Sequence, residues 1–251
     1  MTDFIAEADR RILEAHQLAG FDALWDLQLE AVDEPNTGRG GWSSVFRLEL
    51  DGAAFYLKRQ RDYLTRSLRH PFGEPTFRRE FRSIQRYQRL GIPALQAAFF
   101  GERRVAGEWR AILLTRALEG WQDLAQLFED WSQLAPARRE AIIRACAELA
   151  RKLHNAGQMH GCFYPKHIFL REHAGHFETC LIDLEKTRPI LLGRRDRLKD
   201  IEPLMRRASL WNGADRQLFL QTYLQAPGGS QPLTDWTVRL ERQMRDKESR
   251  K

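Results

Sequence analysis

The sequence predicts an α+β fold in two lobes: a small antiparallel β-sheet with one helix, then a mostly helical half. Residues 36–60 and 94–118 alternate apolar and polar side chains around tight turns, as half-buried strands do. Between them, residues 76–90 carry apolar side chains at helical spacing. The same helical spacing dominates from Trp121 onward, so strands with one helix are followed by a run of helices.

We place the lobe boundary where strand patterns give way to helical ones. The first lobe is expected in residues 1–118 and begins with an N-terminal helix that passes into a strand within thirty residues. The second lobe is expected in residues 119–251, with a long helix opened by Pro136 and ended near Gly157. Two short strands should follow that helix as a small hairpin.

Composition limits the class of protein. The chain has 251 residues, enough for a core that needs no covalent staples, and no apolar run approaches the ~20 residues of a membrane span. The first ten residues carry acids rather than the basic and apolar regions of a secretory signal. The three cysteines lack metal-ligand spacing, and their odd number argues against a disulfide framework. We expect a cytoplasmic protein.

The net charge of +6 indicates an anionic partner or simply a basic surface. Nucleic acid, an anionic membrane surface and a phosphorylated substrate are the partner classes that such a charge suits. The chain has no recognisable nucleic-acid-binding module and no aromatic side chains interleaved on a basic strand face. We therefore expect no nucleic-acid partner.

A glycine-rich turn leads into the first long strand. Its pattern is G-x-G-x-x-G-x-V with serine in place of the third glycine, and its candidate nucleotide-binding residues are Gly38, Gly40, Gly41, Ser43 and Val45. Glycines let a backbone approach phosphate oxygens, and the amides there can donate to them. The alternative is an ordinary glycine-rich hairpin turn.

A lysine and a glutamate complete the expected nucleotide site. Lys58 lies on the second strand, where protein kinases carry the lysine that binds the α- and β-phosphates. Glu80 lies in the helix of residues 76–90, where a kinase needs a glutamate to pair with that lysine. We predict that Lys58 and Glu80 are catalytic residues that pair with each other.

The stretch from Met159 to Leu170 resembles the kinase catalytic loop H-R-D-L-x-x-x-N and the strand after it. His160 occupies the histidine position, Cys162 replaces the catalytic aspartate, and His167 replaces the metal-binding asparagine. Asp183 then stands where the D-F-G segment has its Mg²⁺ ligand. We take His160 and Cys162 as candidate catalytic residues, and Asp183 and His167 as candidate metal ligands.

Basic residues are dense after the second strand. We expect Arg61, Arg66 and Arg69 to bind an anionic acceptor, because arginine forms bidentate contacts with phosphates and carboxylates. The alternative is a solvated basic face.

Together these stretches resemble the lipopolysaccharide core kinase family of the WaaP/InaA type. The resemblance covers about residues 36–200 and includes the Tyr164-x-x-His167 spacing of the catalytic loop. It implies a two-lobed protein-kinase-like fold, ATP and Mg²⁺ as cofactors, and phosphorylation of a heptose or Kdo sugar. It further implies lipopolysaccharide core, or another anionic glycolipid, as partner at the cytoplasmic face of the inner membrane.

Cys162 leaves two functions open. The first is an ATP-dependent sugar kinase, because phosphoryl transfer relies mainly on positioning and charge neutralisation. The second is a nucleotide-binding pseudokinase that acts as a regulatory or partner-binding module in envelope biogenesis. The set of Lys58, Glu80 and Asp183 favours the first.

Overall fold

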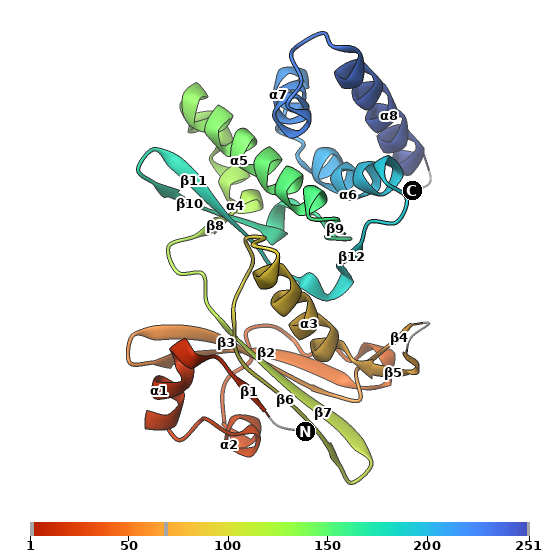
Figure 1. The fold of residues 1–251 in the computed structure, drawn as a ribbon. Coiled ribbons are helices and arrows are strands. Elements are labelled where there is room, and N and C mark those ends of the chain that lie inside the picture. Colours follow the sequence, from red (N-terminus) through yellow and green to blue (C-terminus); the bar gives the residue numbers. More distant parts are fainter. Residues whose placement is uncertain (1–2, 68–69, 250–251) are drawn as a thin grey trace. The chain divides into compact units, whose positions relative to one another are not determined.

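The computed structural model describes residues 3–67 and 70–249, and the chain forms two compact units (Figure 1). The first unit contains the chain up to Gln88 together with Leu95–Glu119. The second contains Arg89–Ala94 together with the chain from Gly120 onward. The mixed helices and strands, with antiparallel pairing in the main sheet, confirm the expected α+β class.

The first unit is built on a five-stranded antiparallel sheet in the order β1-β6-β7-β3-β2. Its strands are β1 (Phe4–Ile5), β2 (Trp42–Leu50), β3 (Ala53–Arg61), β6 (Ala97–Val105) and β7 (Glu108–Arg116). Asp51 and Gly52 turn β2 into β3, and both have positive φ (46° and 78°), as a tight two-residue hairpin requires. A separate hairpin joins β4 (Leu64–Ser67) to β5 (His70–Pro75).

Helices cover both faces of this sheet because successive strand residues point to opposite sides. Phe99 packs in one core with residues of α1 (Glu7–Ala15) and α2 (Phe21–Asp26). The next residue, Phe100, stacks instead on Phe81 of α3 (Thr76–Arg89), with ring centroids 4.4 Å apart. One face therefore supports α1 and α2, and the other supports α3.

The expected strand at the end of the first thirty residues is wrong, because residues 27–30 form no strand. In this segment the carbonyl group of Leu27 has a side-chain donor instead. The Arg59 guanidinium donates to the carbonyl oxygens of Trp25 and Leu27 and lies 4.1 Å from the centre of the Phe46 ring. A side chain of β3 thus binds one carbonyl group at the end of α2 and one just after it.

The second unit is mostly helical. Its helices are α4 (Leu124–Glu129), α5 (Pro136–Asn155), α6 (Arg194–Arg207), α7 (Gly213–Leu224) and α8 (Gln231–Glu248). Its short strands form two small sheets, β8 (Gln122–Asp123) with β10 (Ile168–His173) and β11 (His176–Leu181), and β9 (Gln158–Met159) with β12 (Arg188–Pro189). Short 3-10 turns complete the chain: η1 (Gly38–Gly40) in the first unit, and η2 (Trp131–Gln133), η3 (Pro165–His167) and η4 (Leu184–Lys186) in the second.

Helix α5 is the centre of this unit. Pro136 begins it, which suits a residue without a backbone N–H, and its apolar stripe is buried. That stripe includes Ile142, Ile143, Cys146, Leu149 and Leu153. The segment after α5 is consequently attached to a rigid helix and to the β9–β12 pair.

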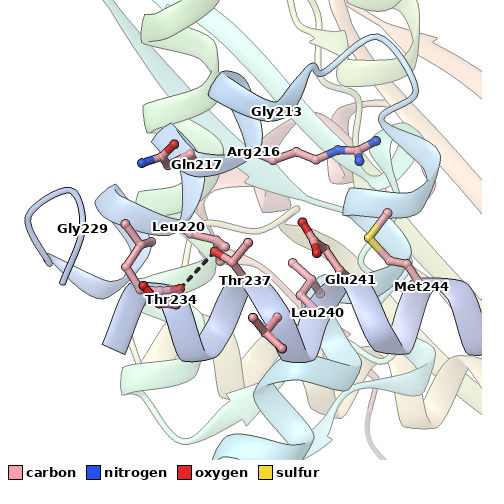
Figure 2. A pocket seen from close by; sticks show the side chains of 12 residues that line it. Gly213, Arg216, Gln217, Leu220, Gly229, Thr234, Thr237, Leu240, Glu241 and Met244 are labelled. Atoms are coloured by element: carbon pink, nitrogen blue, oxygen red, sulfur yellow. Dashed lines mark hydrogen bonds between the residues drawn. The ribbon is translucent and has the colours of Figure 1, made fainter. Parts of the chain in front are cut away.

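Helices α7 and α8 enclose a groove of about 450 Å³ (Figure 2). Leu220 lines it from α7, and Leu240 and Met244 line it from α8. The Thr237 hydroxyl donates to the Leu233 carbonyl at 3.0 Å and so satisfies itself within its own helix. No helix of the described chain has the length and apolar character needed to cross a bilayer.

Gly41 provides a test of the packing at the start of β2. A Cβ at this position would lie 2.1 Å from the Arg61 carbonyl oxygen, so backbone would have to move. We expect Gly41→Ala to lower the free energy of unfolding by about 1–3 kcal/mol in urea titrations. Gly213→Ala is the control because a Cβ there meets nothing within 4 Å, and equal stability of the two variants would contradict this packing.

Candidate functional site

The glycine-rich turn is held by Asn36. The Asn36 side chain accepts from the Gly38 amide at 3.1 Å, and the backbones of Asn36 and Ser43 exchange two hydrogen bonds at 2.8 and 2.9 Å. The amides of Gly38 and Ser43 therefore already have protein acceptors. Gly40 has φ 78°, which favours glycine, and Val45 is half-buried beside Lys58 in the β2–β3 register. Phosphate binding by this turn stays a prediction.

Lys58 and Glu80 form an ion pair in the first unit. Lys58 Nζ lies 2.7 Å from Glu80 Oε1, which joins the middle of β3 to the buried face of α3. The Glu80 side chain is 5% exposed and the Lys58 side chain 20%. The carboxylate is thus desolvated and held by its partner, whereas the ammonium keeps access to solvent and to a further anion.

The basic segment is more neutralised than the sequence indicated. Arg78 binds Glu102 and Arg82 binds Glu74, each through a buried carboxylate. Arg61 lies 3.4 Å from Glu108. Arg66 is exposed on β4, and Arg69 lies outside the described residues. Acceptor binding by Arg61, Arg66 and Arg69 stays a prediction.

In the second unit, His160 connects two segments of the candidate site. Its Nε2 donates to the Ile182 carbonyl at 2.9 Å, and its Nδ1 accepts from the Cys162 amide at 3.2 Å. The ring is fully buried, and burial lowers its pKa. Both ring nitrogens therefore serve the backbone, and we assign His160 to positioning rather than to contact with substrate.

A buried carboxylate that the sequence analysis missed fixes the same loop. Asp200 of α6 accepts from the His160 and Gly161 amides at 2.8 and 2.7 Å. It also binds His154 Nε2 at 3.0 Å, and His154 Nδ1 lies 2.7 Å from the Tyr223 hydroxyl. The only available signal was an acid beside an apolar helical stripe, which alone predicts no partner.

Cys162 is buried, with 4% of its surface exposed. Burial raises the pKa of the thiol, and the positive charge of Lys186 opposes this only in part. The group is thus a thiol at neutral pH, with little capacity to accept a proton. Lys186 is a second residue that the sequence analysis left without a role.

Asp183 and His167 face each other across the loop. Asp183 has left-handed backbone angles (φ 57°, ψ 60°), and its Oδ2 lies 3.4 Å from His167 Nε2. His167 Nδ1 donates to the Cys162 carbonyl at 2.9 Å, so in the neutral ring Nε2 bears a lone pair. Burial lowers the pKa of His167 and favours that neutral form. A lone pair and a carboxylate then point at each other, an arrangement that a bound cation would stabilise.

Comparison with known proteins shows the family of this chain. The chain matches the lipopolysaccharide kinase (Kdo/WaaP) family over residues 22–223. The chain belongs to this family. It is 35% identical over 179 residues to Protein InaA of Escherichia coli K12, covering 70% of this chain and 82% of that protein. The resemblance seen in the motifs is confirmed.

The chain is also similar to a protein and to a solved structure that are both described as WaaP. The lipopolysaccharide core heptose(I) kinase WaaP of Pseudomonas aeruginosa is 27% identical over 204 residues, covering 73% of this chain and 74% of that protein. A solved structure described as WaaP in complex with acyl carrier protein superposes with a TM-score of 0.72 at 24% identity. It covers 98% of this chain and 99% of that one, so the lipopolysaccharide kinase fold extends over nearly the whole length.

The sequence motifs led us to expect Mg²⁺, and the second unit offers few ligands for it. In the part of the chain that the structure describes, no three histidine, cysteine or acidic side chains form a metal-binding group. Mg²⁺ is commonly held by one or two carboxylates together with substrate phosphates. The facing pair of Asp183 and His167 fits such an incomplete site, with the carboxylate as the stronger ligand because imidazole binds Mg²⁺ weakly.

The buried histidines predict acid sensitivity of the second unit. Because burial lowers the pKa of His160 in the folded state, the unfolded state binds more protons below its own pKa of about 6.5. Stability should therefore fall as pH drops from about 6.5 toward the folded value, by up to about 1.4 kcal/mol per pH unit for this group. Urea unfolding between pH 5 and 7 measures it.

His160→Gln should reduce that pH slope by about one proton. His173→Gln is the control because His173 is exposed at the β10–β11 turn. A His160→Gln slope equal to that of the wild type would show that the buried ring does not resist protonation.

Proposed function

We propose that this lipopolysaccharide-kinase family member is an ATP-dependent phosphotransferase. It would phosphorylate a sugar hydroxyl, of heptose or Kdo, in the lipopolysaccharide inner core. The main support is the Lys58–Glu80 ion pair of 2.7 Å. A buried carboxylate that holds one side of a partly exposed ammonium leaves its other side available for phosphate oxygens, as kinase chemistry requires.

In this proposal the first unit binds the nucleotide. Lys58 contacts the α- and β-phosphates while Glu80 fixes its position, and the turn from Gly38 to Ser43 covers the phosphates. Gly41 brings the start of β2 against the Arg61 carbonyl, which keeps this turn close to β3. A glycine-rich backbone permits such an approach.

In the same proposal, residues of the second unit would hold the metal and the phosphoryl group that is transferred. Mg²⁺ would neutralise the charge of the phosphates, with Asp183 as its principal ligand and His167 beside it. His160 keeps Asp183 in place because it binds the carbonyl of Ile182. Lys186, next to Cys162, would add positive charge where the phosphoryl group passes.

Cys162 would then line the acceptor position without acting as a base. A thiol whose pKa is raised does not take the proton of the attacking hydroxyl. A general base contributes about 10²–10⁴ in rate, so a chain without one retains the larger part that comes from positioning and charge. The proton would leave with the phosphate or to solvent.

The raised pKa of Cys162 also supports the alternative, a nucleotide-binding pseudokinase that serves as a regulatory or partner-binding module. The two functions share the nucleotide site and differ in transfer. For either, the partner would be lipopolysaccharide core or another anionic glycolipid at the cytoplasmic face of the inner membrane. Arg61 and Arg66 are the described candidates for contact with it.

Nucleotide binding is tested first. Lys58→Ala should weaken the apparent affinity for MgATP tenfold or more in a thermal-shift titration, since charge-assisted contacts are worth about 1.5–3 kcal/mol. Lys199→Ala, at an exposed lysine of α6, should bind as the wild type does. Transfer of labelled γ-phosphate to dephosphorylated core oligosaccharide then separates kinase from pseudokinase. Unchanged MgATP affinity in Lys58→Ala would contradict the assignment of Lys58 to a nucleotide site.

Cys162→Asp tests the acceptor position. The new carboxylate would lie beside the Lys186 ammonium, so we expect a folded protein with an equal or higher transfer rate. Cys146→Asp is the matched control. Cys146 is fully buried on α5, where burial alone raises the pKa of the thiol, so a charge there should cost several kcal/mol. Equal loss of melting temperature in both variants, without transfer, would favour the pseudokinase.

A further inference from the structure

The loop between β12 and α6 exposes two neighbouring leucines. Leu191 is 77% exposed and Leu192 59%. The loop is nevertheless fixed, because their two amides donate to Asp196 Oδ2 at 2.8 and 2.9 Å. Arg188 binds the other oxygen of Asp196 at 2.8 Å and holds the pKa of that carboxyl well below its usual range. The charged Asp196 carboxylate therefore holds the backbone of both leucines in a position that leaves their side chains exposed to solvent.

A glycine makes the display of the leucines possible. Gly193 has φ 49° and ψ −118°, a backbone conformation that side chains with a Cβ avoid. It turns the chain directly from Leu192 into α6, where the Arg195 amide donates to the Leu192 carbonyl at 3.1 Å. Apolar side chains presented together on an ordered turn indicate a surface that another body covers.

Two arginines follow this turn directly, and they line a hollow together with two arginines of α8. Arg194 and Arg195 begin α6, and Arg239 and Arg242 of α8 line the same hollow of about 620 Å³. Asp246 is the acid among its lining residues. Across residues 3–67 and 70–249, none of the four guanidinium groups has a carboxylate within 4 Å. The helix N-terminus adds further positive potential.

We propose that Leu191, Leu192, Arg194, Arg195, Arg239 and Arg242, here named the leucine–arginine corner, dock the second unit onto an anionic phospholipid bilayer. The presence of leucines together with arginines favours a bilayer as the partner. Leucine side chains enter the boundary between headgroups and acyl chains, and arginines bind the phosphates around them. A soluble phosphate would use the arginines but give the leucines nothing to bury. The proposal does not depend on phosphotransfer.

The position of the corner links membrane contact to the candidate catalytic loop. Arg195 and Asp200 lie on one helix five residues apart, about 8 Å along its axis. Asp200 holds the amides of His160 and Gly161. On the other side, Arg188 of β12 pairs with Met159 of β9, just before the loop. A bilayer bound at the corner would therefore lie near the loop, where a glycolipid acceptor is needed.

Vesicle co-sedimentation of the full chain tests the proposal. Vesicles containing phosphatidylglycerol should bind the wild type, and vesicles of phosphatidylcholine alone should bind it at least tenfold more weakly. Leu191→Ser with Leu192→Ser, and separately Arg194→Glu with Arg195→Glu, should each reduce partition to anionic vesicles at least tenfold. An arginine near such a surface contributes about fivefold in affinity, and reversal removes more.

Controls separate the corner from net charge and from unfolding. Arg138→Glu with Arg144→Glu makes the same charge change on the exposed face of α5 and should leave partition within twofold. The MgATP shift should be unchanged in all three double variants, which isolates this result from the nucleotide site, and the melting temperature should be unchanged in the two corner variants. Equal loss in the α5 control would overturn the proposal, as would undiminished binding of the leucine variant. If the corner variants still bound anionic vesicles but no longer bound an acidic protein that the wild type binds, the corner would be a site for a protein partner instead.

Discussion

The second unit depends on one buried carboxylate, Asp200. Four groups need it: two amides of the catalytic-like loop, the ring of His154, and through that ring the hydroxyl of Tyr223. Burying a carboxylate is costly unless several donors form hydrogen bonds to it. The bonds that offset this cost also hold the donor groups in place. Helices α5, α6 and α7 and the loop are thereby joined at one point. Burial raises the pKa of Tyr223 to about 12, which keeps its hydroxyl protonated as a donor.

The first unit uses a similar constraint at its own site. Glu80 is nearly inaccessible and pairs with Lys58 of β3, so charge holds α3 in position against this strand. Removing the lysine would leave a buried, unpaired carboxylate, which costs more than an exposed pair contributes. Arg59 does the equivalent on the opposite side, where it donates to one carbonyl group at the end of α2 and one just after it. In both cases a long cationic side chain of β3 ties a separate segment to the sheet.

Local patterns predicted most of the fold and, in the candidate site, the contact between Lys58 and Glu80. Alternation and the Asp51–Gly52 turn specify the β2–β3 hairpin, and the apolar stripe of α5 specifies its buried face, because both signals lie within a few residues of their effect. Asp200 could not be predicted in this way, since its partners lie 39 and 40 residues earlier in the chain. The same holds for the charge of Lys186, which acts on the thiol of Cys162. Polar contacts between residues far apart in the chain leave no periodic pattern in the sequence.

The geometry of the loop explains how a family member can carry cysteine at position 162. The loop is held through backbone groups: Asp200 binds the amides of His160 and Gly161, and His167 binds the carbonyl of Cys162. None of these bonds uses the side chain at 162, so exchanging it alters the chemistry while the loop keeps its shape. Gly161 strengthens this independence, because its φ of 80° and its approach to the Lys186 carbonyl exclude a side chain there. The frame that positions Asp183 therefore persists whether or not a base stands beside it.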